Sequence, residues 1–140
     1  EKVLLIEPSA IALERAKLHI RHFDASTKIS VINKGFDAIT PPELQITTAL
    51  PIMHLFSNIL DYEGFELSHL ESLVDSKSDS LNYVVCSSPM INETKTARLY
   101  SFEQYFSMNI GYTHLYDVQN TAGTWLHNWT RVLRVFKYGK

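Results

Sequence analysis

The chain has 140 residues, 45% of them hydrophobic and 11% aromatic, and its formal net charge is −2. This composition is too apolar for a disordered chain and fits one globular domain with a core of its own. The near-neutral charge provides no basic field of the kind that a nucleic-acid-binding protein presents.

The first two predicted elements are a strand over residues 3–6 and a helix over residues 10–23. The strand is a continuous apolar run, which is typical of a strand covered on both faces. Pro8 and Ser9 separate the two elements, since Pro suits the first turn of a helix and Ser can cap it. The apolar spacing of the helix predicts an inward face made of Leu13, Ala16, Ile20 and Phe23.

The next part of the chain alternates between apolar runs and turn-forming residues. A second strand is predicted over residues 29–32 and a third over residues 51–56, ending near residues 57–58. Between these strands, Gly35 and the proline pair at 41–42 indicate a loop. The sequence therefore predicts two strands separated by an irregular connection.

Two further helices flank a fourth strand. The strand is predicted over residues 81–86 and is closed by the Ser-Ser-Pro sequence at 87–89. The helix before it covers residues 66–74, with an apolar side made of Leu67, Leu70, Leu73 and Val74. The helix after it covers residues 96–108, with an apolar side made of Leu99, Phe102, Tyr105 and Phe106.

The C-terminal part of the chain is predicted to be β-structure. Residues 112–118 and 129–138 have strand patterns, and the turn-forming residues 120–123 lie between them. No helix fits in this interval. The two strands therefore form an antiparallel hairpin or a longer β-connection.

Alternation of strands and helices in this order predicts an α/β fold. We expect a doubly wound, mostly parallel sheet with helices on both faces and a C-terminal antiparallel strand pair. Residues 1–140 are expected to form a single Rossmann-like domain. Because the strand pattern begins directly after Glu1 and Lys2, we also expect the chain to be a fragment of a longer protein.

Other features of the sequence bear on location and on alternative chemistries. The single cysteine, Cys86, lies in an apolar run, which predicts a buried structural thiol and a reducing compartment. No apolar run approaches the ~20 residues that span a membrane and no signal peptide is visible, so we expect a cytoplasmic protein. The six histidines show no metal-ligand spacing. The cationic residues near the C-terminus are interpreted as the solvated face of a strand, in preference to a binding patch. They are Arg131, Arg134, Lys137 and Lys140.

Glu7 is the strongest single candidate for a binding residue. In a doubly wound sheet, ligands bind at the carboxyl ends of the strands, and Glu7 directly follows the first predicted strand. A carboxylate there can accept two hydrogen bonds from the vicinal hydroxyls of a ribose. The alternative is a solvated turn acid or a capping partner for the next helix, and spacing alone does not separate it from a ribose-binding role.

The stretch from Val3 to Ser9, followed by Ala12, Leu13 and Ala16, resembles the second strand and following helix of class I S-adenosylmethionine-dependent methyltransferases. That family often has an acid at this strand end and a small residue where Ala16 stands. The resemblance continues through the order of the remaining elements, including the terminal antiparallel pair. It implies a Rossmann-like fold with S-adenosylmethionine as cofactor and leaves the methyl acceptor unknown.

The resemblance also implies where the adenosine part of the cofactor binds. Glu7 would hold the ribose hydroxyls, and Asp37 would meet the adenine amino group. Phe36 or Ile32 would pack on the adenine ring. Asp37 has an alternative as an ordinary loop acid.

A second set of residues is similar to the family's loop beside the methyl group. This set lies in residues 54–62, where Asn58 and Asp61 would face cofactor or substrate. Each has another interpretation. Asn58 suits a turn, and Asp61 is favoured as a helix cap.

The family's glycine-rich loop, which follows its first strand, has no counterpart in this chain. All five glycines are isolated: Gly35, Gly64, Gly111, Gly123 and Gly139. In the family, the first strand lies at the centre of the sheet, between the strands that match residues 3–7 and 52–58. We therefore expect the rest of a longer chain to supply both features, and this fragment alone not to be a competent methyltransferase.

Two other functions remain open. The domain could be a degenerate Rossmann-like module kept for protein contacts within a larger protein. It could instead be a receiver-like regulatory domain, because its first strand, helix and second strand faintly resemble the start of that family. The third predicted strand, however, ends in Ser57 and Asn58 where a receiver domain needs an aspartate.

Overall fold

The computed structural model describes residues 2–44, 46, 50–77, 79–89, 93–120 and 131–140. The chain divides into two compact units, Glu1–Gln45 and Ile46–Lys140. Each unit has its own sheet: β1-β2 in the first and β3-β4-β6-β5 in the second. The overall class is the predicted mixture of α and β. The described strands nevertheless form two sheets where one continuous sheet was predicted, because β1 and β2 pair only with each other among the described strands.

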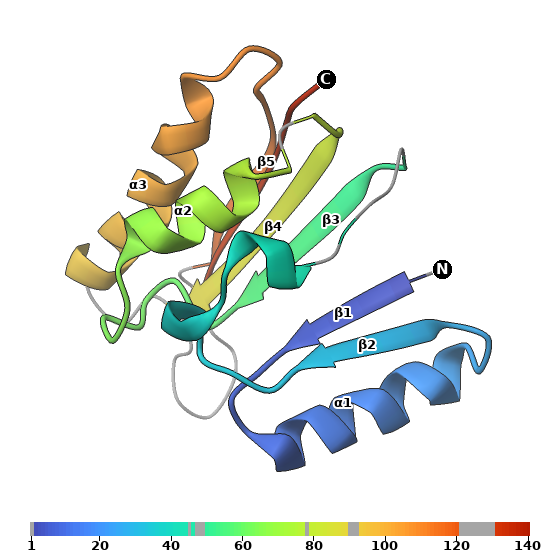
Figure 1. Ribbon diagram of the computed structural model, residues 1–140. Coiled ribbons are helices and arrows are strands. Elements are labelled where there is room, and N and C mark those ends of the chain that lie inside the picture. The colour runs from blue at the N-terminus through green and yellow to red at the C-terminus, as the bar shows by residue number, and fades with distance from the viewer. Residues whose placement is uncertain (1, 45, 47–49, 78, 90–92, 121–130) are drawn as a thin grey trace. The chain divides into compact units, whose positions relative to one another are not determined.

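The first unit is built from two parallel strands and the helix that connects them (Figure 1). Strand β1 (Lys2–Ile6) pairs with β2 (Lys28–Ile32) without a register shift, from Lys2 opposite Lys28 to Ile6 opposite Ile32. Helix α1 (Ala10–Phe23) begins at Ser9, whose hydroxyl accepts a hydrogen bond from the Ala12 N–H at 3.3 Å. The predicted strand–helix–strand order is confirmed, and α1 has the predicted bounds.

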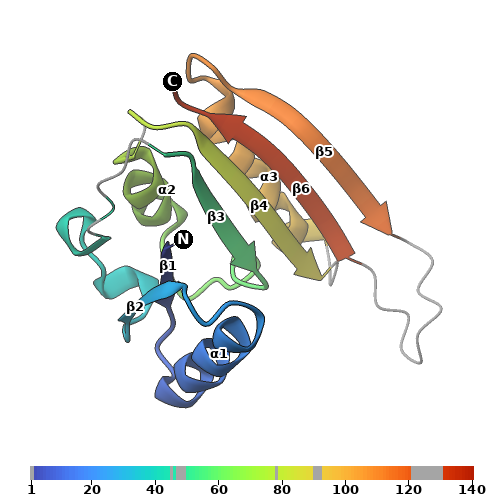
Figure 2. The ribbon, with the colours of Figure 1, turned by 90° about the vertical axis from the view of Figure 1, so that its right-hand side faces the viewer.

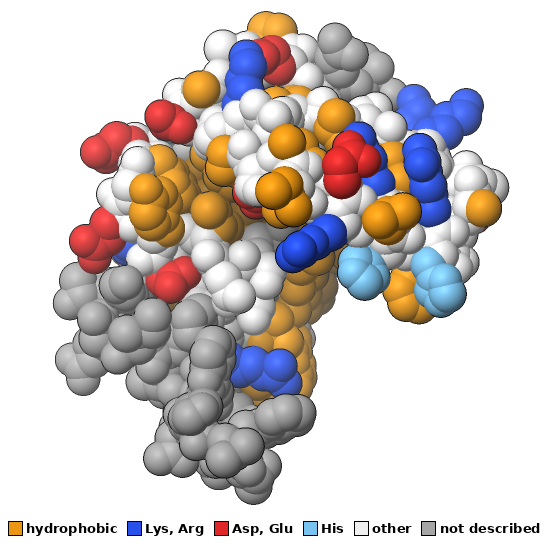
Figure 3. Space-filling model, turned by 90° about the horizontal axis from the view of Figure 1, so that it is seen from below, with side chains coloured by type: hydrophobic (Ala, Val, Ile, Leu, Met, Phe, Trp, Pro, Cys, Tyr) orange, Lys and Arg blue, Asp and Glu red, His pale blue; other side chains and the backbone are white. Residues whose placement is uncertain are grey.

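The packing of α1 differs in part from the prediction. Leu13 is buried and Ile20 is half-buried, as expected, but the Phe23 ring is 86% exposed. Phe23 is the last residue of the helix, where the chain leaves through Asp24 toward β2, and its ring contacts that of His22. The outer surface of α1 therefore carries hydrophobic side chains among basic ones and histidines (Figure 3).

Strand β1 also differs from its prediction, which was burial on both faces. Its apolar residues from Val3 to Ile6 are half-buried. Within this unit α1 packs against β1, and β2 is the only strand beside it among the described residues. The irregular connection predicted after β2 consists of two short 3₁₀ turns, Phe36–Ala38 and Pro41–Leu44.

The second unit has a four-stranded sheet in which the last strand of the chain lies between two other strands and not at an edge (Figure 2). Strand β3 (Ile52–Ser57) is parallel to β4 (Asn82–Pro89), whereas β6 (Arg131–Tyr138) is antiparallel to both β4 and β5 (Thr113–Asn120). The predicted C-terminal antiparallel pair is confirmed. The turn predicted at 120–123 lies outside the described residues beyond Asn120.

Strand β4 is longer than predicted. Ser87, Ser88 and Pro89 were expected to close it, but they pair with Leu133, Val132 and Arg131 of β6. The local Ser-Ser-Pro sequence predicted the end of the strand, but pairing with the distant strand β6 extends β4 through Pro89.

Helices α2 (Leu67–Asp75) and α3 (Glu93–Ser107) pack together and enclose the core of this unit. Leu70, Leu73 and Val74 of α2 are buried, as predicted. In α3, Leu99, Phe102 and Phe106 are buried, but Tyr105 is 42% exposed. The rings of Phe102 and Phe106 lie 5.1 Å apart in an edge-to-face arrangement that suits aromatic quadrupoles.

The opposite face of β3 is not covered by these helices. Ile52 and Phe56 are buried, while Met53 and Leu55 are 70% and 68% exposed. This alternation is the period of two that a strand imposes on its side chains. In this unit, both described helices therefore lie on one face, where helices on both faces of the sheet were predicted.

Gly111, just before β5, has a backbone conformation and a close backbone contact that only glycine accommodates easily. Its φ is +88°, and a Cβ there would lie 2.5 Å from the carbonyl oxygen of Gly139.

Among the described residues, no helix is long and apolar enough to cross a membrane.

Candidate functional site

The candidate site in the first unit starts at the carboxyl ends of β1 and β2. Because the two strands are parallel and in register, both ends lie at the same edge of their sheet. Asn33 follows β2, and its side-chain amide donates to the carbonyl oxygens of Glu7 at 2.9 Å and Pro8 at 2.8 Å. These bonds fix the turn between β1 and α1 to the end of β2.

Glu7 lies in this turn, where it is half-buried. Its Oε1 accepts a hydrogen bond from the Ser9 N–H at 2.9 Å. The other carboxylate oxygen, Oε2, takes no part in this bond. Glu7 therefore supports the turn before α1, as a capping partner would. Its second oxygen could still accept a hydrogen bond from a ribose hydroxyl.

Phe36 and Asp37 lie in the first 3₁₀ turn after β2. Phe36 is half-buried and Asp37 is exposed. The Asp37 carboxylate lies over Gly35, where a Cβ would be 2.6 Å from Oδ1. Thus Glu7, Phe36 and Asp37 all belong to the loops that leave one edge of the β1–β2 pair, as the sequence predicted for the first and last of them.

Asn58, the fourth predicted residue, belongs to the second unit and follows β3. Its φ is +55°, in the left-handed region that Asn tolerates better than most residues. Its backbone N–H donates to the Ser87 carbonyl oxygen at 2.7 Å. The alternative interpretation of Asn58 as a turn former matches this backbone, and its side chain is exposed.

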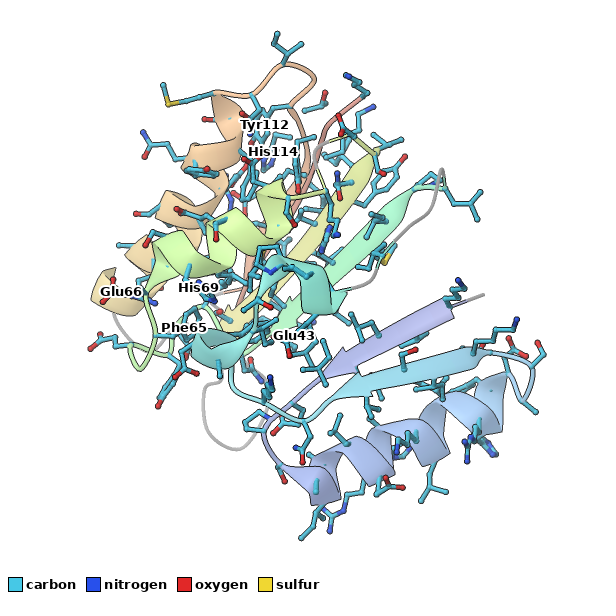
Figure 4. All side chains as sticks on the ribbon, viewed as in Figure 1. Glu43, Phe65, Glu66, His69, Tyr112 and His114 are labelled. Carbon is cyan, nitrogen blue, oxygen red and sulfur yellow. The ribbon has the colours of Figure 1, made fainter. Side chains whose placement is uncertain are left out.

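Arg98 of α3 holds the loop that follows Asn58. It donates from Nε to the Leu60 carbonyl oxygen at 3.0 Å and from Nη2 to the Phe65 carbonyl oxygen at 3.1 Å. Its guanidinium carbon also lies 5.6 Å from the centre of the Phe65 ring, which Figure 4 labels. One cation thus orders both ends of the segment between Leu60 and Phe65.

Asp61 lies within this ordered segment and is 9% exposed. The prediction that it caps a helix is wrong, because α2 begins after Glu66. Its Oδ1 is fully buried and has no hydrogen-bond donor within the described part of the chain.

Sequence reasoning missed a cluster of ionisable side chains around Glu103 of α3. The Glu103 carboxylate accepts hydrogen bonds from the Tyr112 hydroxyl and from His114 Nδ1, the latter at 2.7 Å, and pairs with Arg134. Figure 4 shows Tyr112 and His114 close together. Arg134 also binds Asp117 Oδ2 at 2.9 Å. The sequence feature that could have indicated this cluster is an acidic residue between Phe102 and Phe106, on the apolar side of the predicted helix.

The electrostatics of this cluster favour a charged Glu103. Burial raises its pKa, but the hydrogen bonds from Tyr112 and His114 and the charge of Arg134 outweigh burial, so the pKa lies below its ordinary value. Burial and the neighbouring Glu103 raise the pKa of Cys86 to about 12. Cys86 is therefore a buried neutral thiol, as predicted, and the cluster ties α3 to β5 and β6.

Comparison with known proteins identifies the fold. The chain is similar to the N-methyltransferase NodS from Bradyrhizobium japonicum WM9, with a TM-score of 0.55 and 13% identity over 99% of this chain and 74% of NodS. It is also similar to a Streptococcus mutans protein assigned as a methyltransferase and solved in complex with SAH, with a TM-score of 0.52 and 7% identity over 97% of this chain and 76% of that protein. No family model and no curated protein match the sequence. At these identities the likeness shows the fold alone, which is class I methyltransferase-like.

Proposed function

We propose that this chain is the greater part of an S-adenosylmethionine-dependent methyltransferase domain. The observation that carries the proposal is the gathering of Glu7, Phe36 and Asp37 at the carboxyl edge of a parallel strand pair, in a chain whose fold is shared with methyltransferases. The single cysteine, Cys86, supports a reducing compartment, and we propose the cytoplasm.

The residues at this edge suit the adenosine part of the cofactor. Glu7 would accept hydrogen bonds from the ribose hydroxyls through Oε2, since Oε1 already serves Ser9. Asp37 would accept a hydrogen bond from the adenine amino group, and Phe36 would pack on the ring. As a separate proposal, Asn58 in the loop after β3 would face cofactor or substrate. When bound, the cofactor supplies an electrophilic methyl group, and these side chains bind and orient it.

The glycine-rich loop must come from outside this chain if the proposal holds. The five glycines are isolated, and β1 and β3 each have one strand partner among the described residues. Four described strands have a single strand partner, β1 and β2 in the first unit and β3 and β5 in the second, so each unit has an edge that an additional strand could occupy. We propose that the longer protein supplies this strand with its glycine-rich turn, and that the present chain alone binds the cofactor weakly or not at all.

Isothermal titration of the full-length protein with S-adenosylhomocysteine (SAH) tests this function. We expect binding by the wild-type protein and a loss of roughly tenfold or more in the Glu7→Gln variant, because one hydrogen bond to a charged group is worth about 1.5–3 kcal/mol. Glutamine keeps an oxygen for the Ser9 N–H, so the turn before α1 is preserved.

Ser9→Ala is the matched control. It removes the helix cap and lowers the free energy of unfolding by about 1 kcal/mol, while it leaves the Glu7 carboxylate intact. SAH affinity should not change in this variant. No SAH binding by the full-length wild-type protein would remove the enzyme function and favour a degenerate Rossmann-like module kept for protein contacts.

A further inference from the structure

The side chain of Asn33 joins two loops that carry different parts of the proposed cofactor site. Asn33 directly follows β2 and lies in the same loop as Phe36 and Asp37. Its Nδ2 donates one hydrogen bond to the Glu7 carbonyl oxygen at 2.9 Å and one to the Pro8 carbonyl oxygen at 2.8 Å. The loop after β2 is thus attached to the turn between β1 and α1, which is distant in the sequence.

These two bonds need an amide group at position 33. A carbonyl oxygen only accepts hydrogen bonds, so two carbonyl partners require two N–H donors on the same side chain. Aspartate has the shape of asparagine without a donor, and serine or threonine has a single hydroxyl donor. Asn33 is exposed, so its side chain does not fill the core. Its contribution is to fix the backbone of the turn before α1.

The backbone of Glu7 is held on both sides by the end of β2. Its N–H donates to the Ile32 carbonyl oxygen at 3.2 Å, and its carbonyl oxygen accepts the bond from Asn33. The Glu7 carboxylate is held separately by the Ser9 N–H at 2.9 Å. A group that is already fixed loses less conformational freedom when it binds a ligand.

The loop after β2 also has contacts of its own. Lys34 Nζ lies 2.6 Å from Glu43 Oε1, and Glu43 Oε2 accepts a hydrogen bond from the Thr40 N–H at 2.9 Å. These contacts hold the loop itself, whereas those of Asn33 connect it to the turn before α1. The two effects can therefore be separated by substitution.

We infer that Asn33 is a positioning residue, which fixes the turn that carries Glu7 to the loop that carries Phe36 and Asp37, so that both bind one adenosine together. The inference rests on the proposed function and adds to it a residue that acts through Glu7 without contacting the cofactor. Binding of the ribose should depend on Asn33, and binding of the adenine ring should not.

Competition titration of the full-length protein, in which adenosine or adenine displaces SAH, tests the inference. Asn33→Ala should weaken adenosine binding about fivefold, because the lost hydrogen bonds are neutral ones, and should leave adenine binding unchanged. Asn33→Asp, which keeps the side-chain shape without an N–H donor, should give the same result. Equal losses for adenosine and adenine would mean that Asn33 only supports the loop structure, and would overturn the inference.

Lys34→Met is the matched control. Lys34 is the next residue, is also exposed, and forms its ion pair within the loop after β2. Any effect of this change should reach adenosine and adenine equally, so the ratio of their affinities should remain that of the wild type. A change in this ratio as large as that of Asn33→Ala would contradict the role given to Asn33. Absence of SAH binding by the wild-type protein would overturn the methyltransferase function as well.

Hydrogen exchange without ligand, followed by NMR, provides a second readout. In Asn33→Ala, the amides of Glu7 and Ser9 should exchange about fivefold faster, because the turn is no longer attached to β2 through the amide. The amides of Ala38 and Ile39 bond to carbonyl oxygens within their own loop and should exchange as in the wild type. Unchanged exchange at Glu7 and Ser9 would show that Asn33 does not order the turn, and the inference would fail.

Discussion

At the scale of single residues, His54 shows how the fold determines which ring nitrogen carries a proton. The amide nitrogen of Asn82 donates to the carbonyl oxygens of Lys77 at 3.0 Å and Ser80 at 2.6 Å, so its Oδ1 is left as an acceptor. His54 Nε2 lies 2.8 Å from that oxygen and must therefore carry the proton. Asn82 is fully buried at the start of β4, so this network connects β3, β4 and the turn before β4.

The same network predicts a loss of stability in mild acid. Burial lowers the pKa of His54 below its ordinary value of 6.5; the bond to Asn82 opposes this shift and the nearby charge of Lys77 adds to it. The fold thus favours neutral His54, whose contribution is present above about pH 6.5 and is lost as pH falls toward the folded pKa. A single proton changes the free energy of unfolding by at most about 1.4 kcal/mol per pH unit.

Denaturant unfolding between pH 8 and pH 5 measures this effect. The wild-type protein should lose stability below pH 6.5, and the His54→Gln variant should lose less over the same interval. His19→Gln is the control, because His19 is exposed on α1 and should leave the wild-type pH dependence unchanged. Parallel curves for wild type and His54→Gln would show that another group is responsible.

At the scale of elements, the Glu103 cluster attaches α3 to the C-terminal strands. Glu103 has a side-chain exposure of 5% and Arg134 of 16%, so this ion pair is shielded from water. Tyr112, just before β5, and His114, within β5, complete the contacts of Glu103. A buried pair need not stabilise a fold relative to an apolar pair, but removing one member leaves an uncompensated charge.

Glu103→Ala should therefore lower the free energy of unfolding by about 3–5 kcal/mol. Gln104→Ala, at the neighbouring exposed position of α3, should change it by less than about 0.5 kcal/mol. Urea unfolding followed by circular dichroism gives both values. The Glu103→Met, Arg134→Met double variant should recover part of the loss, because it removes both charges. Equal stability of Glu103→Ala and wild type would mean that the cluster does not hold α3.

At the scale of the whole molecule, the two units differ in how their strands are supported. In the second unit, β4 and β6 each have a strand on both sides and a core of buried aromatic residues such as Phe102, Phe106 and Phe136. In the first unit, β1 and β2 each have one neighbour among the described residues. Local opening is easiest where few apolar contacts and neighbouring strands resist it.

Hydrogen exchange on the 140-residue chain should reflect this difference. The amides of β4 and β6 should exchange most slowly and those of β1 and β2 faster. In the full-length protein, the proposed additional strand should slow exchange in β1 and β3 while leaving β5 unchanged. Mass spectrometry of protease fragments resolves these segments. Identical protection of β1 in both proteins would contradict the proposed strand.

Much of the fold could be predicted because its signals are local. Apolar residues recur with a period of 3.6 in α1 and a period of two in the C-terminal strands, and both periods are visible within a short stretch of sequence. The turn residues Pro8 and Ser9 are equally local signals. The same local rules placed Glu7 at a strand end, where the structure has it. The grouping of Phe36 and Asp37 with Glu7 followed from parallel pairing, a general property of strands joined by a helix.

The sequence alone therefore determined the elements, their order and the α/β class. Only the tertiary structure decided the partners: β6 between β4 and β5, the extension of β4 through Pro89, the burial of Asp61, and the meeting of Glu103 with Arg134. These features join residues that are far apart in the chain, so no local pattern contains them. Their free energy depends on which surfaces exclude water together, and that is settled when the whole chain folds.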